Sequence, residues 1–459
     1  LSILVCALGL NIAVSHAAPP NVLILVADQW RAQSFGYAGD PNVQTPHIDS
    51  LAHESANFKN AIASVPVCGP TRASLLTGQR ALTHGIFMND VPLRNEALTF
   101  AEVLKETGYE TGYVGKWHLN GNGHRAGFIP RERRQGFDYW KVLECTHEYN
   151  HSFYYGDTPN KLQWEGYDAI AQTRDAQQYL RDHAKSKKPF VFMLAWGPPH
   201  SPYQTAPAKY RAMYDPAKIK LRANVPPEAA EKTRRDLAGY YAHCTALDDC
   251  VGDLMQSLRD TGLAENTIVI FSADHGDMLG SHGMAAKQKP YDESIRVPLL
   301  FRWPKELKAR ELDAVFSSED FMPTLFGLCR VKMPAKMEGL DYSEYLRGGK
   351  NFSDNVALFS CVAPFGEWDR RRGGKEMRGI RTRRYTYVRD LNGPWLLFDN
   401  QVDPMQMTNR VDDAKLRGEL DKTLMSKLKE AHDEFLPAEF YIKKWGYQTN
   451  ATGTVPYAD

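Results

Sequence analysis

The chain has 459 residues, of which 43% are hydrophobic and 24% are charged, values typical of a soluble globular protein with a large core. Its 56 basic residues nearly balance its 55 acidic residues, which argues against binding to nucleic acids or membrane surfaces through bulk charge. An anionic substrate would therefore have to be held by local groups.

The first 18 residues are expected to be part of an export signal. They form an apolar run that ends in small residues, with Ser15 and Ala17 at the −3 and −1 positions of a cleavage site. A buried first helix is the alternative. No later apolar stretch approaches the ~20 residues of a membrane span. We therefore expect an exported protein, periplasmic or secreted, with no membrane span and no nucleic-acid partner.

Apolar segments alternate with helical patterns over residues 19–346. Residues 21–27, 58–65, 110–114, 190–196, 267–273 and 297–302 read as strands. Residues 48–54, 98–107, 169–185 and 234–258 read as helices. This alternation predicts the α/β class, with a large, mostly parallel or mixed sheet sandwiched by helices in a catalytic domain at 19–346.

The chain changes character after residue 346. Residues 356–361, 376–382, 385–390 and 394–399 read as short strands, and Asn392-Gly393 is a good hairpin signal. A helix is expected at 413–434. We therefore predict a smaller C-terminal subdomain at 347–459, built on an antiparallel sheet. The seven cysteines include no CxxC pair, so neither a zinc site nor a dense disulfide framework is indicated.

Polar residues follow the predicted strands at their carboxyl ends, where an open α/β sheet binds its ligand. Asp28 and Gln29 follow one strand, and Asp274 and His275 follow another that could be its neighbour. Hard oxygen ligands suit Ca²⁺ or Mg²⁺, and an imidazole leaves Mn²⁺ possible. Helix capping is the alternative role for these aspartates.

Four further cationic or proton-donating side chains stand in loops, most of them after other strands. A metal ion and several such donors around one nucleophile fit transfer of an anionic group. The alternative is a set of solvated lysines and buried, satisfied histidines. The four residues are Lys116, His118, His200 and Lys287.

Cys68 begins a motif that reads as a nucleophile delivered to a helix start. Pro70 suits a first helical turn, and Arg72 offers a guanidinium fork to an oxyanion or to the nucleophile. The composition predicts roughly 0.05 chance matches to Cys-x-Pro-x-Arg. A structural cysteine beside a helix cap is the alternative.

Together these motifs resemble the type I, formylglycine-dependent sulfatase family of the alkaline-phosphatase-like superfamily. The resemblance covers nearly the whole chain after residue 18, and the Cys-x-Pro-x-Arg element followed by Leu-Thr-Gly is highly specific. The matching segments are residues 22–30, 68–78, 115–119, 199–203, 272–283 and 291–298.

The resemblance implies a mechanism. A formylglycine-generating or anaerobic sulfatase-maturing enzyme would convert Cys68 to formylglycine, whose hydrated gem-diol attacks the sulfur of a sulfate ester. Arg72 would orient the diol, and His118 would assist it. Lys116, His200 and Lys287 would bind sulfate, the last two near the leaving oxygen. The implied ligands of Ca²⁺ are Asp28, Asp274, His275 and the diol of residue 68, with Gln29 as a further candidate.

Three positions depart from the family pattern. Gln29 stands where many members have a second Asp, and His275 stands where many have Asn. Gly69 replaces the small or hydroxyl residue usual after the cysteine. Gln and His can still act as ligands, so the expected metal site is retained while its preferred ion is left open.

The expected substrate is a sulfated carbohydrate. Trp30, Arg31 and the aromatic and basic loop at 125–155 suggest a sugar stacked on rings and held by arginines, although the loop could equally be a surface loop with core aromatics. A phosphonate monoester or phosphodiester hydrolase of the same superfamily is the nearest alternative. The pair of Lys116 and His118 favours a sulfatase. A non-catalytic protein that binds sulfated glycans is the alternative of another class.

Overall fold

The computed structural model describes residues 18–121, 123–335 and 337–458. Residues 1–17, which carry almost all of the predicted export signal including Ser15 and Ala17, lie outside this part. None of the helices in the described ranges combines the length and the hydrophobicity of a membrane span.

A nine-stranded sheet forms the centre of the molecule. Its strands follow the order β11-β2-β10-β8-β1-β7-β3-β4, and β9 pairs with β2. Only β9 and β10 run antiparallel to their neighbours, so the predicted mixed, mostly parallel sheet is confirmed. The strands are β1 (Asn21–Asp28), β2 (Ala56–Ile62), β3 (Glu110–Lys116), β4 (Tyr139–Leu143), β7 (Phe190–Pro199), β8 (Thr267–Ala273), β9 (Arg296–Val297), β10 (Leu299–Arg302) and β11 (Arg310–Ser317).

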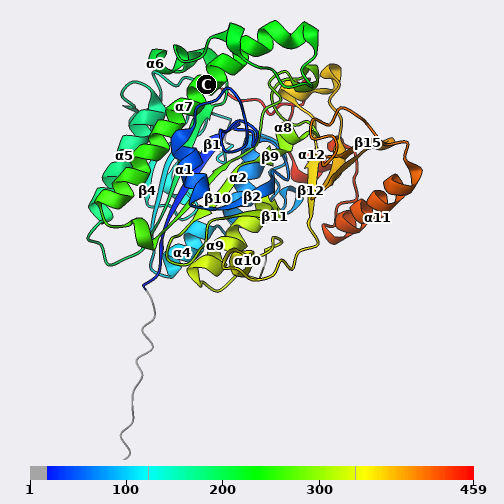
Figure 1. Cartoon of the computed structure of the whole chain (residues 1–459). Coiled ribbons are helices and arrows are strands. Elements are labelled where there is room, and N and C mark those ends of the chain that lie inside the picture. Colours follow the sequence, from blue (N-terminus) through cyan, green and yellow to red (C-terminus); the bar gives the residue numbers. More distant parts are fainter. Residues whose placement is uncertain (1–17, 122, 336, 459) are drawn as a thin grey trace, which may run out of the picture.

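Helices flank this sheet in two groups (Figure 1). In one, α5 (Asp168–His183) and α7 (Ala230–Asp260) pack side by side against β7, and α1 (Pro46–His53) packs on α7. The other comprises α2 (Cys68–Thr77), α4 (Phe100–Glu106), α9 (Phe321–Cys329) and α10 (Ser343–Leu346).

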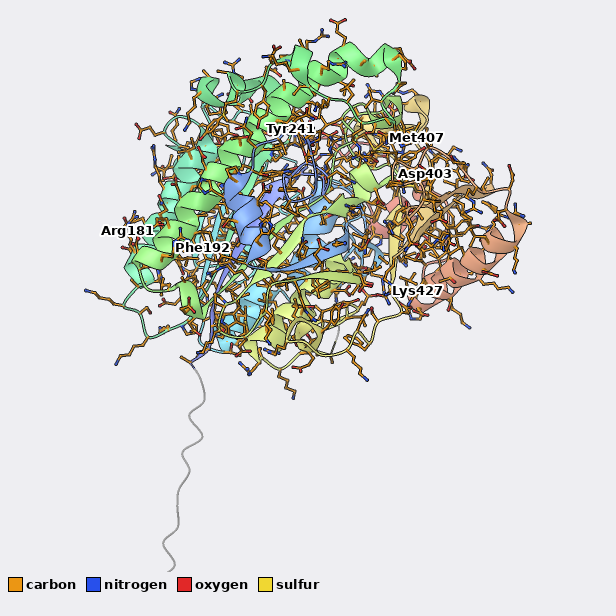
Figure 2. The ribbon with its side chains drawn as sticks, in the orientation of Figure 1. Arg181, Phe192, Tyr241, Asp403, Met407 and Lys427 are labelled. Atoms are coloured by element: carbon orange, nitrogen blue, oxygen red, sulfur yellow. The ribbon has the colours of Figure 1, made fainter. Side chains whose placement is uncertain are left out.

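Residues of the central strands are buried on both faces because helices cover the sheet. Phe192 on β7 and Tyr241 on α7 lie inside the core, whereas Arg181 on α5 reaches solvent (Figure 2). The continuous apolar runs of β1, β7 and β8 are the sequence signature of this double-sided burial.

The carboxyl ends of four parallel strands meet at one edge of the sheet. β1 lies between β7 and β8, and β3 lies beyond β7. Leu25 of β1 pairs with Leu194 of β7 and with Phe271 of β8. The polar residues after β1 and β8 are therefore neighbours, as predicted.

The C-terminal part forms a four-stranded antiparallel sheet in the order β12-β13-β14-β15, as predicted. One face packs on α11 (Ala414–Glu430) through Leu420, Leu424 and Leu428. The other face packs on residues of the main domain, including Ile62 and Met278. The strands are β12 (Val356–Cys361), β13 (Met377–Thr382), β14 (Tyr385–Asp390) and β15 (Gly393–Asp399), and a last helix α12 (Ala438–Trp445) follows.

Several elements were not predicted. β4 lies in the aromatic and basic segment of weak periodicity, and β11 is an edge strand with charged residues at its start. α9 and α12 were also missed, as were six short elements. These are α3 (Ala81–His84), α6 (Ala208–Arg211), α8 (Asp292–Ile295), α10 (Ser343–Leu346), β5 (Phe153–Tyr154) and β6 (Leu162–Gln163).

Candidate active site

Cys68 is the first residue of α2 and is only 1% exposed. The preceding Val67 is extended (φ −151°, ψ 144°), so the chain turns into the helix at Cys68 itself. Pro70 stands in the first turn, as predicted, where its missing N–H costs the helix nothing. Gly78 ends the helix with φ 62°, a left-handed conformation that suits glycine. The motif thus delivers one buried side chain to a helix N-terminus.

The Cys68 sulfur is surrounded by charged and polar groups. Its Sγ lies 3.1 Å from Lys287 Nζ, 3.2 Å from His275 Nε2 and 3.6 Å from Asp28 Oδ1. Burial raises the pKa of the thiol, but Lys116, Lys287 and His275 outweigh this effect and bring it well below its usual value. Position 68 is therefore suited to an anionic or strongly polarised group.

The buried Arg72 guanidinium holds the two aspartates of the site. Its Nε donates to Asp274 Oδ2 at 3.0 Å, and its Nη2 lies 3.4 Å from Asp28 Oδ2. Its Nη1 donates to the Lys116 carbonyl oxygen at 2.9 Å. Among the described residues, its side-chain hydrogen bonds go to these three residues. Arg72 thus fixes the carboxylates, whereas we expected it to serve the nucleophile or an oxyanion directly.

Four residues offer ligand atoms that could hold a metal ion. One atom each from Asp28, Cys68, Asp274 and His275 lies within 4.8 Å of all the others. His275 Nδ1 lies 2.9 Å from the Gly276 carbonyl oxygen, which can only accept, so Nδ1 carries a proton and Nε2 faces Cys68. Two carboxylates and an imidazole fit Ca²⁺, Mg²⁺ or Mn²⁺.

Gln29 turns its amide oxygen towards the same site. Its φ of 68° lies in the left-handed region, and its backbone N–H donates to Asp274 Oδ1 at 3.0 Å. Its Nε2 donates to Asp277 Oδ2 at 2.6 Å, which leaves Oε1 to accept from Lys287 Nζ at 3.3 Å. Asp277 was not among the predicted site residues, although it lies in the segment 272–283 that resembles the family.

The four predicted anion-binding residues converge on one cavity of about 400 Å³ that Cys68 also lines. Lys287 Nζ lies 3.1 Å from His200 Nε2, while His200 Nδ1 lies 2.8 Å from the Ser201 carbonyl oxygen. Burial and the Lys287 charge keep the pKa of His200 well below its usual value. The four residues are Lys116, His118, His200 and Lys287.

A buried ion-pair chain holds His118. Its Nε2 lies 3.3 Å from Asp90 Oδ1, and Arg125 binds the same carboxylate twice, at 2.8 and 2.7 Å. Burial lowers the pKa of His118, but Cys145 and Asp90 raise it to about 10. The sequence carried no motif for Asp90, and it marked Arg125 only as part of a basic loop.

Trp30 and Arg31 lie in the core instead of at the cavity. Trp30 is fully buried, and its ring stacks on Phe35 with centroids 4.5 Å apart. Arg31 is 1% exposed, and its Nε donates to Ser34 Oγ at 2.7 Å. Neither residue lines the cavity, so the expected contacts of these two side chains with substrate are not supported.

The loop at 125–155 divides between the site and the core. Arg125 and His147 line the cavity, and so does Cys145. Trp140 and Tyr149 are buried with the core residues. Part of this loop therefore faces the cavity, and part of it packs in the core.

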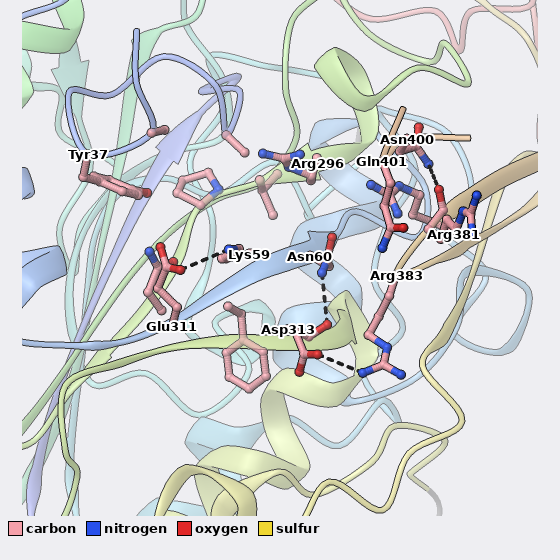
Figure 3. A pocket seen from close by; sticks show the side chains of 17 residues that line it. Tyr37, Lys59, Asn60, Arg296, Glu311, Asp313, Arg381, Arg383, Asn400 and Gln401 are labelled. Atoms are coloured by element: carbon pink, nitrogen blue, oxygen red, sulfur yellow. Dashed lines mark hydrogen bonds and ion pairs between the residues drawn. The ribbon is translucent and has the colours of Figure 1, made fainter. Parts of the chain in front are cut away.

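A larger cavity of about 730 Å³ lies elsewhere, between strands β2 and β11 of the main sheet and the C-terminal sheet (Figure 3). Its basic side chains already have acidic partners. Lys59 Nζ lies 3.0 Å from Glu311, and Arg383 Nη1 lies 2.8 Å from Asp313. None of the predicted site residues lines it, so size alone does not identify the active site.

Comparisons with known proteins agree with the geometry. The family described as Sulfatase matches residues 20–331, and the one described as N-sulphoglucosamine sulphohydrolase, C-terminal, matches residues 280–434. An ulvan-active sulfatase of Formosa agariphila is 45% identical over 439 residues, which cover 93% of this chain and 84% of that protein. An endo-4-O-sulfatase of Bacteroides thetaiotaomicron is 28% identical, covering 86% and 88%.

A solved structure of another sulfatase has the same fold. The crystal structure of a Bacteroides fragilis sulfatase matches 94% of this chain and 100% of its own, with 30% identity and a TM-score of 0.84. The Sulfatase match spans well over half of this chain. It contains the four residues that could hold a metal ion and the four cationic or proton-donating residues that line the cavity. The chain therefore belongs to the sulfatase family of the alkaline-phosphatase-like superfamily, and it is a sulfuric ester hydrolase.

Proposed function

We propose that this sulfatase removes sulfate esters from a sulfated polysaccharide. The observation that carries the proposal is the cationic cavity around buried residue 68, where the side chains of Lys116, His118, His200 and Lys287 converge. Such a cluster suits a small tetrahedral anion whose charge must be stabilised during transfer. Two of the proteins similar to this chain are named for action on ulvan and for 4-O-desulfation, which supports a carbohydrate substrate.

The proposal includes conversion of Cys68 to formylglycine by a formylglycine-generating or anaerobic sulfatase-maturing enzyme. Pro70 and Arg72 complete the motif that supports this modification. The hydrated aldehyde would supply the attacking oxygen. A bound divalent cation, Ca²⁺ with Mg²⁺ or Mn²⁺ as alternatives, would stabilise negative charge on the reacting oxygens. The residues that would hold it are Asp28, Gln29, Asp274 and His275.

The side chains divide the remaining work. Lys116 and Lys287 hold the sulfate oxygens as ammonium groups, because nearby negative charges raise the pKa of each despite burial. Lys287 Nζ lies 3.1 Å from His200 Nε2, so in this pair the proton for the leaving sugar oxygen would come from the Lys287 ammonium group. His118, held by Asp90, keeps an Nδ1 that bonds no described group and can bind the oxygen on residue 68.

Export to the periplasm or the medium is part of the proposal. A polysaccharide that is too large to enter a cell must meet its sulfatase outside the cytoplasm. The apolar segment at 1–18 supports this location. Fractionation of cells that express the full-length gene would test it, and retention in the cytoplasm would contradict it.

Desulfation assays on defined sulfated oligosaccharides, beside an aryl sulfate and an aryl phosphate diester, test the activity. We expect sulfate release from an oligosaccharide and a peptide at Cys68 that is lighter by ~18 Da, the change from thiol to aldehyde. Preference for the diester would favour a phosphonate monoester or phosphodiester hydrolase. Activity confined to the aryl sulfate would contradict the polysaccharide substrate.

A further inference from the structure

The cavity around Cys68 has walls of two origins. Its inner wall comes from residues 68–287, within the segment that matches the sulfatase family. Its outer wall includes Thr452, Thr454 and Tyr457, which lie beyond residue 434 and outside both matched segments. The end of the chain therefore adds a feature to the site that the family matches do not cover.

Backbone hydrogen bonds attach this C-terminal segment, residues 446–458, to the rim. The Ala458 N–H donates to the Gly123 carbonyl oxygen at 2.6 Å, and the Arg125 N–H donates to the Ala458 carbonyl oxygen at 3.2 Å. The Gly366 N–H donates to the Thr452 carbonyl oxygen at 3.1 Å. In Figure 1 the red part of the chain leaves α12 and runs away from α11. The segment is thus fixed on both sides of the cavity.

Tyr457 presents an aromatic surface at this rim. The Arg125 guanidinium lies 3.5 Å from the ring centroid, and Asp90 fixes that guanidinium through two short hydrogen bonds. Tyr457 nevertheless keeps 39% of its surface exposed while lining the cavity. A rigid ring that is backed by a cation and open to a cavity can stack against the C–H face of a sugar.

Two charged side chains stand in the same outer wall. Glu367 and Arg372 are both exposed, and within the described ranges neither side chain makes a hydrogen bond or an ion pair. A carboxylate accepts hydrogen bonds from hydroxyl groups, and a guanidinium donates to them. An aromatic ring that lines the same cavity as a hydrogen-bond acceptor and a hydrogen-bond donor is a combination that can bind a pyranose.

We propose that Tyr457, Glu367 and Arg372 form a subsite for a pyranose ring of the substrate, beyond the sulfate group that the inner cations hold. The C-terminal segment would thereby give the enzyme its preference for a carbohydrate over a small sulfate ester. This inference rests on the proposed function, because it concerns the sugar to which that sulfate is attached.

Kinetics on two substrates test the subsite. In the Tyr457→Ala variant we expect the ratio of kcat/KM for a sulfated oligosaccharide to kcat/KM for an aryl sulfate to fall about tenfold, mainly through KM. Tyr457→Phe keeps the ring and should keep the ratio. Phe440→Ala removes an exposed ring of α12 that lies outside the cavity, and it should leave the ratio unchanged.

Three results would overturn the inference. An unchanged ratio in Tyr457→Ala would show that the ring does not contact the sugar. An equal loss of kcat on both substrates would show that the ring acts instead through Arg125 and Asp90 on His118. Calorimetry separates this test from the proposed activity, because the inactive Cys68→Ala protein should bind the oligosaccharide and Cys68→Ala/Tyr457→Ala should bind it about tenfold more weakly. Equal binding by both would also overturn the subsite.

Discussion

Serine at position 68 would preserve the shape of the side chain but remove the thiol that a cysteine-type maturing enzyme oxidises. In a host with only such an enzyme, Cys68→Ser should bind substrate and lose turnover, because the cations and carboxylates around residue 68 remain. Mass spectrometry of the peptide and a desulfation assay measure the two effects. Cys329→Ser, at a buried cysteine of α9, is the control and should keep its activity when folded. Turnover by Cys68→Ser at the normal rate would contradict the mechanism.

Asp90 is a positioning residue, because it holds His118 and Arg125 and does not itself line the cavity. Replacing Asp90 with Asn removes the negative charge that holds Nε2 and leaves Arg125 without its ion pair. We expect kcat to fall at least tenfold while KM changes little, since general acid–base groups contribute ~10²-fold or more. Steady-state kinetics on an aryl sulfate measure kcat and KM separately. Asp138→Asn, at an exposed ion pair with Lys105, should leave both constants unchanged. A rise in KM alone would contradict the role.

At the scale of the elements, α12 is anchored by close packing on one glycine. A Cβ added to Gly85 would lie 2.1 Å from Cζ3 of Trp445, the last residue of α12, and the φ of Gly85 is 87°. Gly85→Ala should therefore displace α12 and lower the free energy of unfolding. It should also lower the preference for the oligosaccharide, because α12 leads into the segment that carries Tyr457.

Gly108 offers a matched control for this prediction. Its φ is 97°, and an added Cβ would meet no atom within 4 Å. Gly85→Ala and Gly108→Ala share the backbone strain, so their difference in unfolding free energy isolates the contact with Trp445. Overpacking of this kind costs roughly 1–3 kcal/mol. Equal destabilisation of the two variants in chemical denaturation would contradict the packing argument.

The elements that the sequence predicted best are those with the simplest pattern of burial. β1, β8 and β12 begin at the predicted residue and end within one residue of it, because their runs are continuous and end at turns or polar residues. β11 was missed because charged side chains occupy its exposed positions at the sheet edge. α12 was missed because only two of its residues, Ala438 and Tyr441, are buried.

At the scale of the whole molecule, a motif predicts the residues near the nucleophile but not those that distant segments bring to it. Asp28, Lys116 and Asp274 were predictable because parallel strands end at one edge of the sheet. Tyr457 lies on the cavity only because the chain returns to Gly123 after α12. Trp30 follows Asp28 and Gln29 of the site in sequence, but its ring stacks on Phe35 in the core. The strand order of a parallel sheet places the residues at the strand ends. The position of Tyr457 depends instead on packing between segments that are far apart in the sequence.

A buried ion pair joins the short helix α8 of the main domain to the C-terminal sheet. Asp292 of α8 receives two hydrogen bonds from Arg381 of β13, at 3.0 and 3.1 Å, and both residues are nearly inaccessible to solvent. Burial raises the pKa of Asp292, but Arg381 and Arg296 outweigh it and bring the pKa to about 2. A carboxyl in an unfolded chain titrates near about 3.9. The stabilisation is therefore complete above about pH 5 and is lost as the pH falls from there through 2.

Asp292→Asn should lower the free energy of unfolding at pH 7 by about 3–5 kcal/mol, because it leaves Arg381 as a buried charge without its partner. It should also flatten the decline in stability between pH 5 and pH 3, since the titrating group that this decline reflects is gone. Chemical denaturation across that pH range measures both effects. Asp236→Asn removes an exposed pair with Lys232 on α7 and should change stability by less than about 1 kcal/mol. If the two variants were equally stable at pH 7, the pair of Asp292 and Arg381 would not be what holds the C-terminal sheet against the main domain.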